Sequence, residues 1–218
     1  MMNTVAVIDY GMGNLHSVAK ALEKVASNTR VLVSADPAEV LKADRVVLPG
    51  VGAIRDCMAE IKRLGFDQVV SQVVESGKPL LGVCVGMQAM MQHSVENNGT
   101  DCLGIFPGRV EYFGDDLRDP VSDERLKVPH MGWNQVHQTI EHPIWQDIPQ
   151  DSRFYFVHSY YVQSEDSAIT AASCEYGLSF TSAVTRNNVF ATQFHPEKSQ
   201  HVGLQLYANF LRWDGSPV

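Results

Sequence analysis

The chain has 218 residues, of which 44% are hydrophobic and 19% charged, and its formal net charge is −8 at pH 7. This length and apolar share predict one globular domain over residues 1–218. The acidic balance and the lack of a basic run argue against binding to nucleic acid. No stretch is long and apolar enough to span a bilayer, and the first nine residues lack the features of a signal peptide, so we expect a cytoplasmic protein.

In the first half of the chain, short apolar runs alternate with segments whose apolar residues recur at helical spacing. The expected strands are Thr4–Ile8, Arg30–Val33, Arg45–Leu48 and Lys78–Leu81. The expected helices begin after Asn14, at Asp36, after Gly52 (in two parts divided near Gly65) and at Met87. This alternation predicts a parallel sheet with helices on both of its faces.

The second half contains β-like runs that are separated by turn residues. The expected strands are Arg109–Phe113, Arg153–Val157, Ala168–Glu175, Ser179–Thr185 and Val189–Gln193, and a last helix is expected over Ser199–Leu211. We therefore predict an α/β fold of three layers. Its mostly parallel central sheet is flanked by helices, and an antiparallel β portion is added to the same domain.

The segment Gly82–Gln88 places Cys84 between two glycines, where a buried strand leads into a helix. A nucleophile elbow has this form, because the sharp turn leaves little room for side chains on either side. A helix N-terminus also favours the thiolate, the reactive form of cysteine. The four cysteines show no zinc-type spacing, and we interpret them as reduced thiols, with Cys57 and Cys174 as packing residues beside the unremarkable Cys102. We predict no metal site and no cofactor.

A candidate base follows far downstream, in the segment Gln193–Glu197. His195 and Glu197 are two residues apart near the expected end of a strand, so their side chains should project to the same side. Glu197 would then orient the imidazole, while His195 exchanges a proton with Cys84 and a leaving amine. The alternative is that Glu197 only begins the last helix and that His195 has a structural role.

Acyl transfer also needs hydrogen-bond donors for an oxyanion. The backbone amide of Val85, directly after the nucleophile, is one candidate. Val51 and Gly52 lie in a glycine-rich loop after a neighbouring strand and are the candidates for the second donor. The alternative for this loop is an ordinary glycine turn.

Together, Gly82–Gln88 and Phe194–Glu197 resemble the motifs of the triad-type (class I) glutamine amidotransferases. Four more segments narrow this resemblance to the glutaminase-subunit family of imidazole glycerol phosphate synthases, and the match extends over essentially the whole chain. These segments are Asp9–Asn14, Leu48–Gly52, Val128–Asn134 and Phe156–Tyr161. Val85 stands where leucine is more common in the family, which matters little for a role of its backbone amide.

The resemblance implies that Cys84 attacks the side-chain amide of glutamine, releases ammonia and forms a thioester that water hydrolyses to glutamate. It also implies that Gln88, Ser159 and Tyr160 hold the amino-acid end of the substrate. The ammonia would pass to a separate barrel-shaped cyclase subunit, which forms imidazole glycerol phosphate and an aminoimidazole carboxamide ribotide (AICAR) in histidine biosynthesis. The chain lacks a G-x-x-x-x-G-K phosphate loop, which fits a synthase partner in a second chain.

The family places Asn14 and Trp133 near the ammonia exit, so both are candidates for contacts with the cyclase in a heterodimer, although Trp133 could equally belong to the core. His130 and His158 lack metal-type spacing and are interpreted as structural. Two other functions stay open. One is a different class I amidotransferase or a cysteine hydrolase of esters or peptides, and the other is a scaffold without catalysis. The order of histidine before acid disfavours an α/β-hydrolase.

Overall fold

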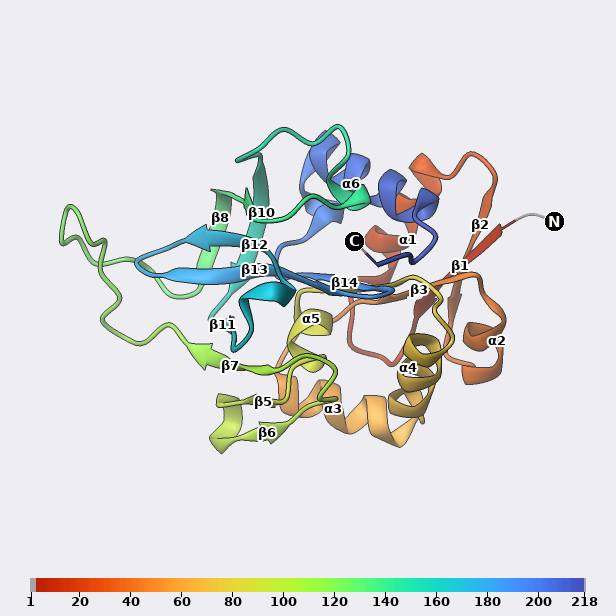
Figure 1. Ribbon diagram of the computed structural model, residues 1–218. Helices are drawn as coiled ribbons and strands as arrows, with labels where there is room; N and C mark the ends of the chain where they lie inside the picture. Colours follow the sequence, from red (N-terminus) through yellow and green to blue (C-terminus); the bar gives the residue numbers. More distant parts are fainter. Residues whose placement is uncertain (1–2, 218) are drawn as a thin grey trace.

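A computed structural model describes residues 3–217, and a mixed sheet of 12 strands runs through this part of the chain (Figure 1). Five strands in the order β2-β1-β3-β4-β14 form its parallel portion, and each pairs in parallel with its neighbour. They are β1 (Asn3–Ile8), β2 (Thr29–Ser34), β3 (Arg45–Leu48), β4 (Leu80–Val83) and β14 (Val189–Thr192). The strand from the end of the chain, β14, therefore lies beside one from the first half, β4.

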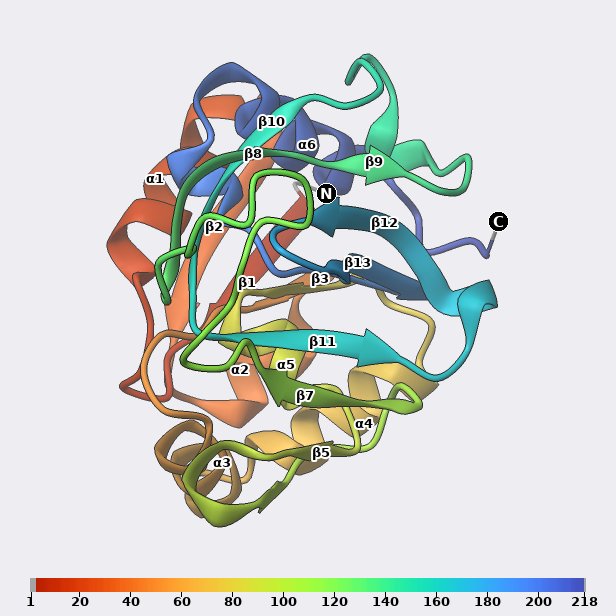
Figure 2. The same cartoon turned by 90° about the vertical axis from the view of Figure 1, so that its left-hand side faces the viewer.

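Beyond β14 the sheet is largely antiparallel and continues in the order β13-β11-β7-β5-β6, while β12 pairs with β13 and β9 pairs with β12 (Figure 2). These strands are β5 (His93–Ser94), β6 (Thr100–Asp101), β7 (Gly108–Tyr112), β9 (His137–Gln138), β11 (Tyr160–Ser164), β12 (Thr170–Glu175) and β13 (Ser179–Arg186). A separate antiparallel pair is formed by β8 (His130–Gln135) and β10 (Arg153–His158). One sheet joins both halves of the chain, which supports our proposal of a single domain.

Helices cover both faces of the parallel portion. The pair α1 (Leu15–Val25) and α6 (Gln200–Arg212) packs together above the sheet in Figure 1, and α3 (Ile54–Arg63), α4 (Phe66–Glu75) and α5 (Val85–Ala89) lie below it. The short α2 (Pro37–Lys42) packs against α4. Four single 3₁₀ turns complete the elements: η1 (Glu96–Asn98), η2 (Pro143–Trp145), η3 (Ser167–Ile169) and η4 (Pro196–Lys198). The predicted three-layer α/β architecture is confirmed.

Local sequence signals account for two of the helix boundaries. At the start of α2, the Asp36 carboxylate accepts the backbone N–H of Ala38 at 2.8 Å, and Pro37 occupies the first helical position, where its missing N–H costs nothing. Between α3 and α4, Gly65 has φ 76°, a conformation that glycine adopts without strain. Both boundaries were predicted from the sequence.

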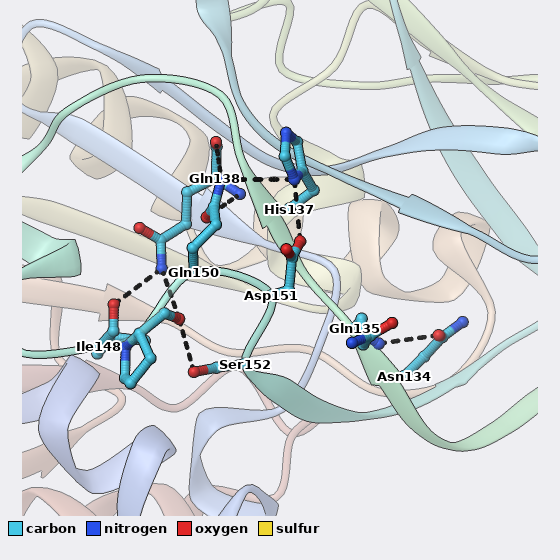
Figure 3. A network of polar contacts seen from close by, with 9 residues as sticks. Asn134, Gln135, His137, Gln138, Ile148, Gln150, Asp151 and Ser152 are labelled. Carbon is cyan, nitrogen blue, oxygen red and sulfur yellow. Dashed lines mark hydrogen bonds and ion pairs between the residues drawn. The ribbon is translucent and has the colours of Figure 1, made fainter.

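Amide side chains fasten the segment that follows β8 (Figure 3). Gln138 and Gln150 exchange hydrogen bonds, since the Gln138 N–H donates to Gln150 Oε1 at 3.0 Å and Gln150 Nε2 donates to the Gln138 carbonyl at 2.9 Å. His137 Nδ1 lies 2.9 Å from Asp151 Oδ1. These contacts join β9 to the turn at residues 147–152.

The strands that carry the site are fully buried: Leu80, Leu81, Phe190 and Ala191 are all 0% exposed. A residue at the end of such strands is therefore held on a rigid base. None of the helices within residues 3–217 has the length and apolar character needed to cross a membrane.

Candidate active site

Cys84 lies at the sharp turn between β4 and α5, as the sequence predicted. Its φ of 54° and ψ of −110° form a strained conformation that is rare for a residue with a side chain. The turn is tight because a Cβ on Gly86 would overlap the Leu48 carbonyl oxygen. Cys84 itself is held by its N–H, which donates to the Thr192 carbonyl at 2.8 Å, and it is 4% exposed. The thiol is thus fixed at the end of two paired strands, β4 and β14.

His195 and Glu197 follow β14, the parallel neighbour of β4. His195 Nδ1 lies 2.8 Å from Glu197 Oε1, and both side chains are at most 2% exposed. Tyr207 Oη donates to the second carboxylate oxygen of Glu197 at 3.3 Å. His195 Nε2 is buried and has no hydrogen-bond partner among residues 3–217. Glu197 therefore occupies one ring nitrogen and leaves the other available to the nearby thiol.

Both backbone polar groups of His195 are held by hydrogen bonds. Its N–H donates to the Tyr155 carbonyl at 2.9 Å, while Ser199 Oγ donates to its carbonyl at 2.6 Å. The same Ser199 hydroxyl accepts the N–H of Tyr155 at 3.0 Å. Since Ser199 is 0% exposed, these bonds form away from competing water and fix the position of the imidazole.

The charges of the three groups are coupled. Burial alone would lower the pKa of His195, but the charge of Cys84 and the hydrogen bond and charge of Glu197 outweigh this effect and raise the pKa to about 10. The imidazolium form of His195 is therefore favoured at neutral pH. Burial and the charge of Glu197 raise the pKa of Tyr207 well above its usual value, so its hydroxyl remains a donor to the carboxylate.

A cavity of about 420 Å³ opens at the thiol, and its size suits a small polar molecule. Most of the predicted site residues line this cavity, namely Cys84, His195, Val51, Gly52, Val85, Gln88, Ser159 and Tyr160. Glu197 lies behind His195. The cavity is also lined by Glu96, Pro129, Val157, His158 and Lys198, none of which was singled out from the sequence as a ligand contact.

Gln88 is 4% exposed and its side chain has a defined orientation. Its Nε2 donates to the Tyr160 carbonyl at 3.0 Å and to Gln193 Oε1 at 3.1 Å, which uses both amide hydrogens. Gln88 can therefore offer a ligand only its own carbonyl oxygen, a hydrogen-bond acceptor. Gln193 in turn directs its Nε2 to Cys84 Sγ at 3.8 Å. Gln193 thus links the Gln88 side chain to the Cys84 thiol. The sequence did not indicate this role, because Gln193 stood only at the end of an expected strand.

Glu96 supplies a carboxylate to the same cavity. Its Oε2 accepts the N–H of Ile54, at the start of α3, at 3.1 Å. This bond satisfies one of the free amides of the helix terminus and positions the carboxylate. The sequence around Glu96 is a polar turn without periodicity, so only the fold reveals its proximity to Cys84.

The three predicted oxyanion residues, Val85, Val51 and Gly52, all line the cavity, but the Val85 amide is not free. The N–H of Val85 is occupied, because it donates to the Gly50 carbonyl at 3.4 Å. A peptide unit places its C=O and N–H on opposite sides, so the Val51 N–H of that same peptide points away from the Val85 amide. Gly52 has φ 99°, which explains the glycine, and Val51 is 36% exposed. In this conformation an oxyanion cannot reach the Val85 amide until the Gly50 carbonyl turns aside.

A pair of buried histidines supports the far wall of the cavity. His158 Nδ1 lies 2.8 Å from the Tyr160 carbonyl, to which it must donate, and His158 Nε2 then accepts from His130 Nδ1 at 2.9 Å. Asn134 Nδ2 completes the series at 3.3 Å from His130 Nε2. Every nitrogen has one defined role only while both rings are neutral. The pair thereby fixes the same Tyr160 carbonyl that receives Gln88, in accord with the structural role inferred from the sequence.

These histidines predict acid sensitivity. Burial lowers the pKa of His130 and His142 to about 4, and burial, opposed by the bond to Tyr160, lowers that of His158 to about 3. The unfolded chain binds these protons near pH 6.5, so the stabilisation is complete above that pH and is lost as the pH falls towards 4. Between these pH values we expect the free energy of unfolding to fall by about 1.4 kcal/mol per pH unit for each histidine, or about 4 kcal/mol per pH unit for all three.

Urea unfolding at pH 6.5, 5.5 and 4.5 measures this slope, below the range in which the raised pKa of His195 makes stability depend on pH with the opposite sign. The variant His142→Gln should reduce it by about one third, because one of the three buried histidines is removed. A free energy of unfolding that stays constant over this range would contradict the prediction.

The two predicted partner contacts lie outside the cavity. Asn14 directly precedes α1 and is partly buried, without a side-chain capping bond to the helix. Trp133 on β8 is 42% exposed, packs edge-on against Tyr155, and has the 62% exposed Met131 two residues before it on the same strand. Trp133 is therefore a surface residue, and the alternative of a core position does not apply.

Comparisons with known proteins agree with the fold and with the motifs. The family model described as Glutamine amidotransferase class-I matches residues 6–212, so the chain belongs to the class-I glutamine amidotransferase family. Within it, the chain is 60% identical over 215 residues to imidazole glycerol phosphate synthase subunit HisH 1 of Pseudomonas aeruginosa, covering 99% of both chains. It is 59% identical over 214 residues to subunit HisH of Pseudomonas putida, covering 98% of this chain and 99% of that one. The resemblance drawn from the sequence motifs is confirmed.

Solved structures share the fold at much lower identity. The structure described as PurLQS from Thermotoga maritima superposes with a TM-score of 0.72 at 16% identity and covers 97% of this chain and 99% of that one. A crystal structure described as a glutamine amidotransferase gives a TM-score of 0.69 at 17% identity and covers 95% and 97%. At such low sequence identities, the similarity shows only that these proteins share a fold.

Proposed function

We propose that the chain is the glutaminase subunit of an imidazole glycerol phosphate synthase in histidine biosynthesis. In this role it hydrolyses glutamine to glutamate and ammonia through a thioester on Cys84. The observation that carries the proposal is the position of Cys84 on its strained turn, in one cavity with His195, whose other nitrogen is bound by Glu197. A scaffold without catalysis would have no need for this strain or for a buried acid behind a buried histidine.

The reaction begins with attack of the Cys84 thiolate on the γ-carboxamide carbon of glutamine. A C–S bond forms, and the carbonyl electrons move to oxygen as an oxyanion. Imidazolium at His195 then delivers its Nε2 proton to the amide nitrogen, the C–N bond breaks, and ammonia leaves. Neutral His195 next takes a proton from a water molecule, whose oxygen attacks the thioester. The C–S bond breaks, glutamate leaves, and the thiolate–imidazolium pair is restored.

The cavity offers complementary groups for the amino-acid end of glutamine. The Gln88 carbonyl oxygen and the Glu96 carboxylate are acceptors suited to an α-ammonium group. The backbone at Ser159 and Tyr160, held by His158 and Gln88, forms the opposite wall. Fixed contacts of this kind would select an α-amino acid amide over simple amides and esters, because a substrate without the charged groups leaves the buried Gln88 oxygen and the Glu96 carboxylate without an ammonium partner.

The ammonia would pass to a separate cyclase subunit, which uses it to form imidazole glycerol phosphate and AICAR. We assign Asn14 and the exposed Trp133 as contacts to this subunit. The role would place the heterodimer in the cytoplasm. Ammonia would then be consumed close to where it is released, before it is protonated or lost to solvent.

We expect the isolated chain to hydrolyse glutamine slowly and the cyclase, together with imidazole glycerol phosphate, to stimulate it. The reason is that the Gly50 carbonyl occupies the Val85 amide, and losing one oxyanion donor typically lowers kcat by about 10²–10³. The stimulation should therefore appear in kcat and reach about 10²-fold or more. A continuous assay of glutamate formation with and without the cyclase measures this ratio, and full activity of the isolated chain would contradict the expectation.

The proposal as a whole is tested with glutamine labelled with ¹⁵N in its side-chain amide. The complex of chain and cyclase should incorporate the label into imidazole glycerol phosphate even when unlabelled ammonium is present in excess. Turnover of glutamine is compared with turnover of a γ-glutamyl ester and of peptides, because a general cysteine hydrolase would prefer these substrates. Absence of glutamine hydrolysis by the complex would overturn the proposal.

A further inference from the structure

Two buried side chains outside the catalytic relay hold the loop that carries the oxyanion donors. Tyr10, in the loop after β1, donates its hydroxyl to the Pro49 carbonyl at 2.8 Å. Cys57, in the first turn of α3, donates its thiol to the Val51 carbonyl at 3.5 Å. The carbonyl between them, that of Gly50, accepts the Val85 amide at 3.4 Å. Three successive carbonyls are thus bound, and the middle one is bound by the proposed oxyanion donor itself.

Both side chains are suited to a permanent role as donors. Tyr10 is 1% exposed and Cys57 is 0% exposed, so water does not compete for either bond. Burial raises the pKa of the Tyr10 hydroxyl far above its usual range and that of the Cys57 thiol to about 11. Each group therefore keeps its proton at any pH at which the enzyme works. Neither group is required by the chemistry of glutamine hydrolysis.

We propose that Tyr10 and Cys57 are positioning residues that hold the two peptides on either side of the Gly50–Val51 peptide, so that this peptide alone turns when the oxyanion site opens. This inference rests on the proposed glutaminase function. With the Pro49 and Val51 carbonyls fixed, the turn changes only ψ of Gly50 and φ of Val51. It moves the Gly50 carbonyl away from the Val85 amide and directs the Val51 N–H towards the thiol.

The distances support this division between fixed and turning peptides. A 2.8 Å O–H···O bond is near the optimum, whereas 3.4 Å is long for N–H···O and such a bond breaks more easily. Gly50 also lies directly against the tyrosine, because a Cβ at this position would be 2.7 Å from Tyr10 Oη and 2.9 Å from the Gly86 nitrogen. A side chain at residue 50 would block the turn, and its absence leaves ψ free.

The test distinguishes the loss of a hydrogen-bond donor from the loss of side-chain packing. In the complex with the cyclase and imidazole glycerol phosphate, Cys57→Ala and Tyr10→Phe should lower kcat for glutamine about 10-fold, less than the full loss of an oxyanion donor. The KM for glutamine should stay within about 2-fold, because the contacts of Gln88, Ser159 and Tyr160 are unchanged. Cys57→Ser keeps a donor of similar size and should restore most of kcat.

Cys174 provides the matched control. It is also a buried cysteine, 2% exposed, but lies on β12 away from the loop. Cys174→Ala and Cys174→Ser should leave kcat unchanged, and thermal unfolding of all variants shows how much each substitution affects stability. A merely structural role for Cys57 would lower the melting temperature without changing kcat.

Two results would overturn the inference while the wild-type complex hydrolyses glutamine. One is an unchanged kcat in both Cys57→Ala and Tyr10→Phe, and the other is an equal loss in Cys57→Ser and Cys57→Ala. A wild-type complex that does not hydrolyse glutamine would instead contradict the proposed function, so the two failures are distinguishable.

Discussion

Cys84→Ala is expected to abolish glutamine hydrolysis, lowering kcat by about 10⁴-fold or more, both alone and with the cyclase. The substitution removes the sulfur that would form the proposed thioester, and nucleophile substitutions in related relays have effects of this order. Cys84 is 4% exposed and the β-carbon is retained, so the fold should persist. Release of glutamate from glutamine, followed over hours, measures the loss.

Ammonium supplies the control for this substitution. Because the proposed cyclase partner would consume ammonia, the complex that contains the Cys84→Ala chain should still form imidazole glycerol phosphate when ammonium salts are added. A second control is Cys174→Ala, a buried cysteine on β12, which should retain activity. Measurable turnover of glutamine by the Cys84→Ala chain would mean that another group carries the acyl transfer.

Glu197→Gln should lower kcat by about 10³–10⁴-fold and change its pH dependence. A carboxylate at 2.8 Å from His195 Nδ1 keeps the proton on that nitrogen, whereas an amide can donate to it and favour the unproductive tautomer. The carboxylate is also one of the groups that raise the pKa of His195 to about 10. Without its charge the pKa falls, so imidazolium is lost, and activity declines, at a lower pH than in the unmodified chain.

The pH profile of kcat/KM between pH 6 and 11 tests whether the pKa of His195 falls in the Glu197→Gln variant. For the unmodified chain we expect the alkaline decline near pH 10, and for Glu197→Gln we expect it at lower pH. Tyr207→Phe removes only the 3.3 Å bond to the other carboxylate oxygen and serves as the comparison, with a smaller effect. An alkaline limb that moves upward in Glu197→Gln would contradict the assigned role of the carboxylate.

The sequence predicted the parallel portion of the sheet well, because its strands are apolar runs next to clear turn and cap residues. Asp36 and Gly65 are examples in which one residue determines a boundary. Three strands of the second half, β8, β9 and β11, were not predicted as strands. In β8 the burial alternates, but its sequence of His, Met, Gly, Trp, Asn and Gln contains no β-branched residue and only one aromatic strand former, so strand propensity gives a weak signal.

The site residues likewise fall into those that the sequence could identify and those that it could not. Cys84, His195 and Glu197 could be found because each stands at the end of a recognisable strand and within a short motif. Glu96 and Gln193 could not, since their contacts depend on which distant segments the fold brings together. The hydrogen bond from the Val85 amide to the Gly50 carbonyl could not be predicted either, because residue types do not determine which way a single peptide group faces.

The place of β14 in the sheet has a consequence for how the site is assembled during folding. This strand comes after all the other described strands in the sequence, yet it lies between β4 and β13, and His195 and Glu197 follow it directly. Until β14 has paired with β4, the thiol is present without its proposed proton acceptor. We therefore expect glutamine hydrolysis to depend on completion of the central sheet, so that partly folded chains would be inactive.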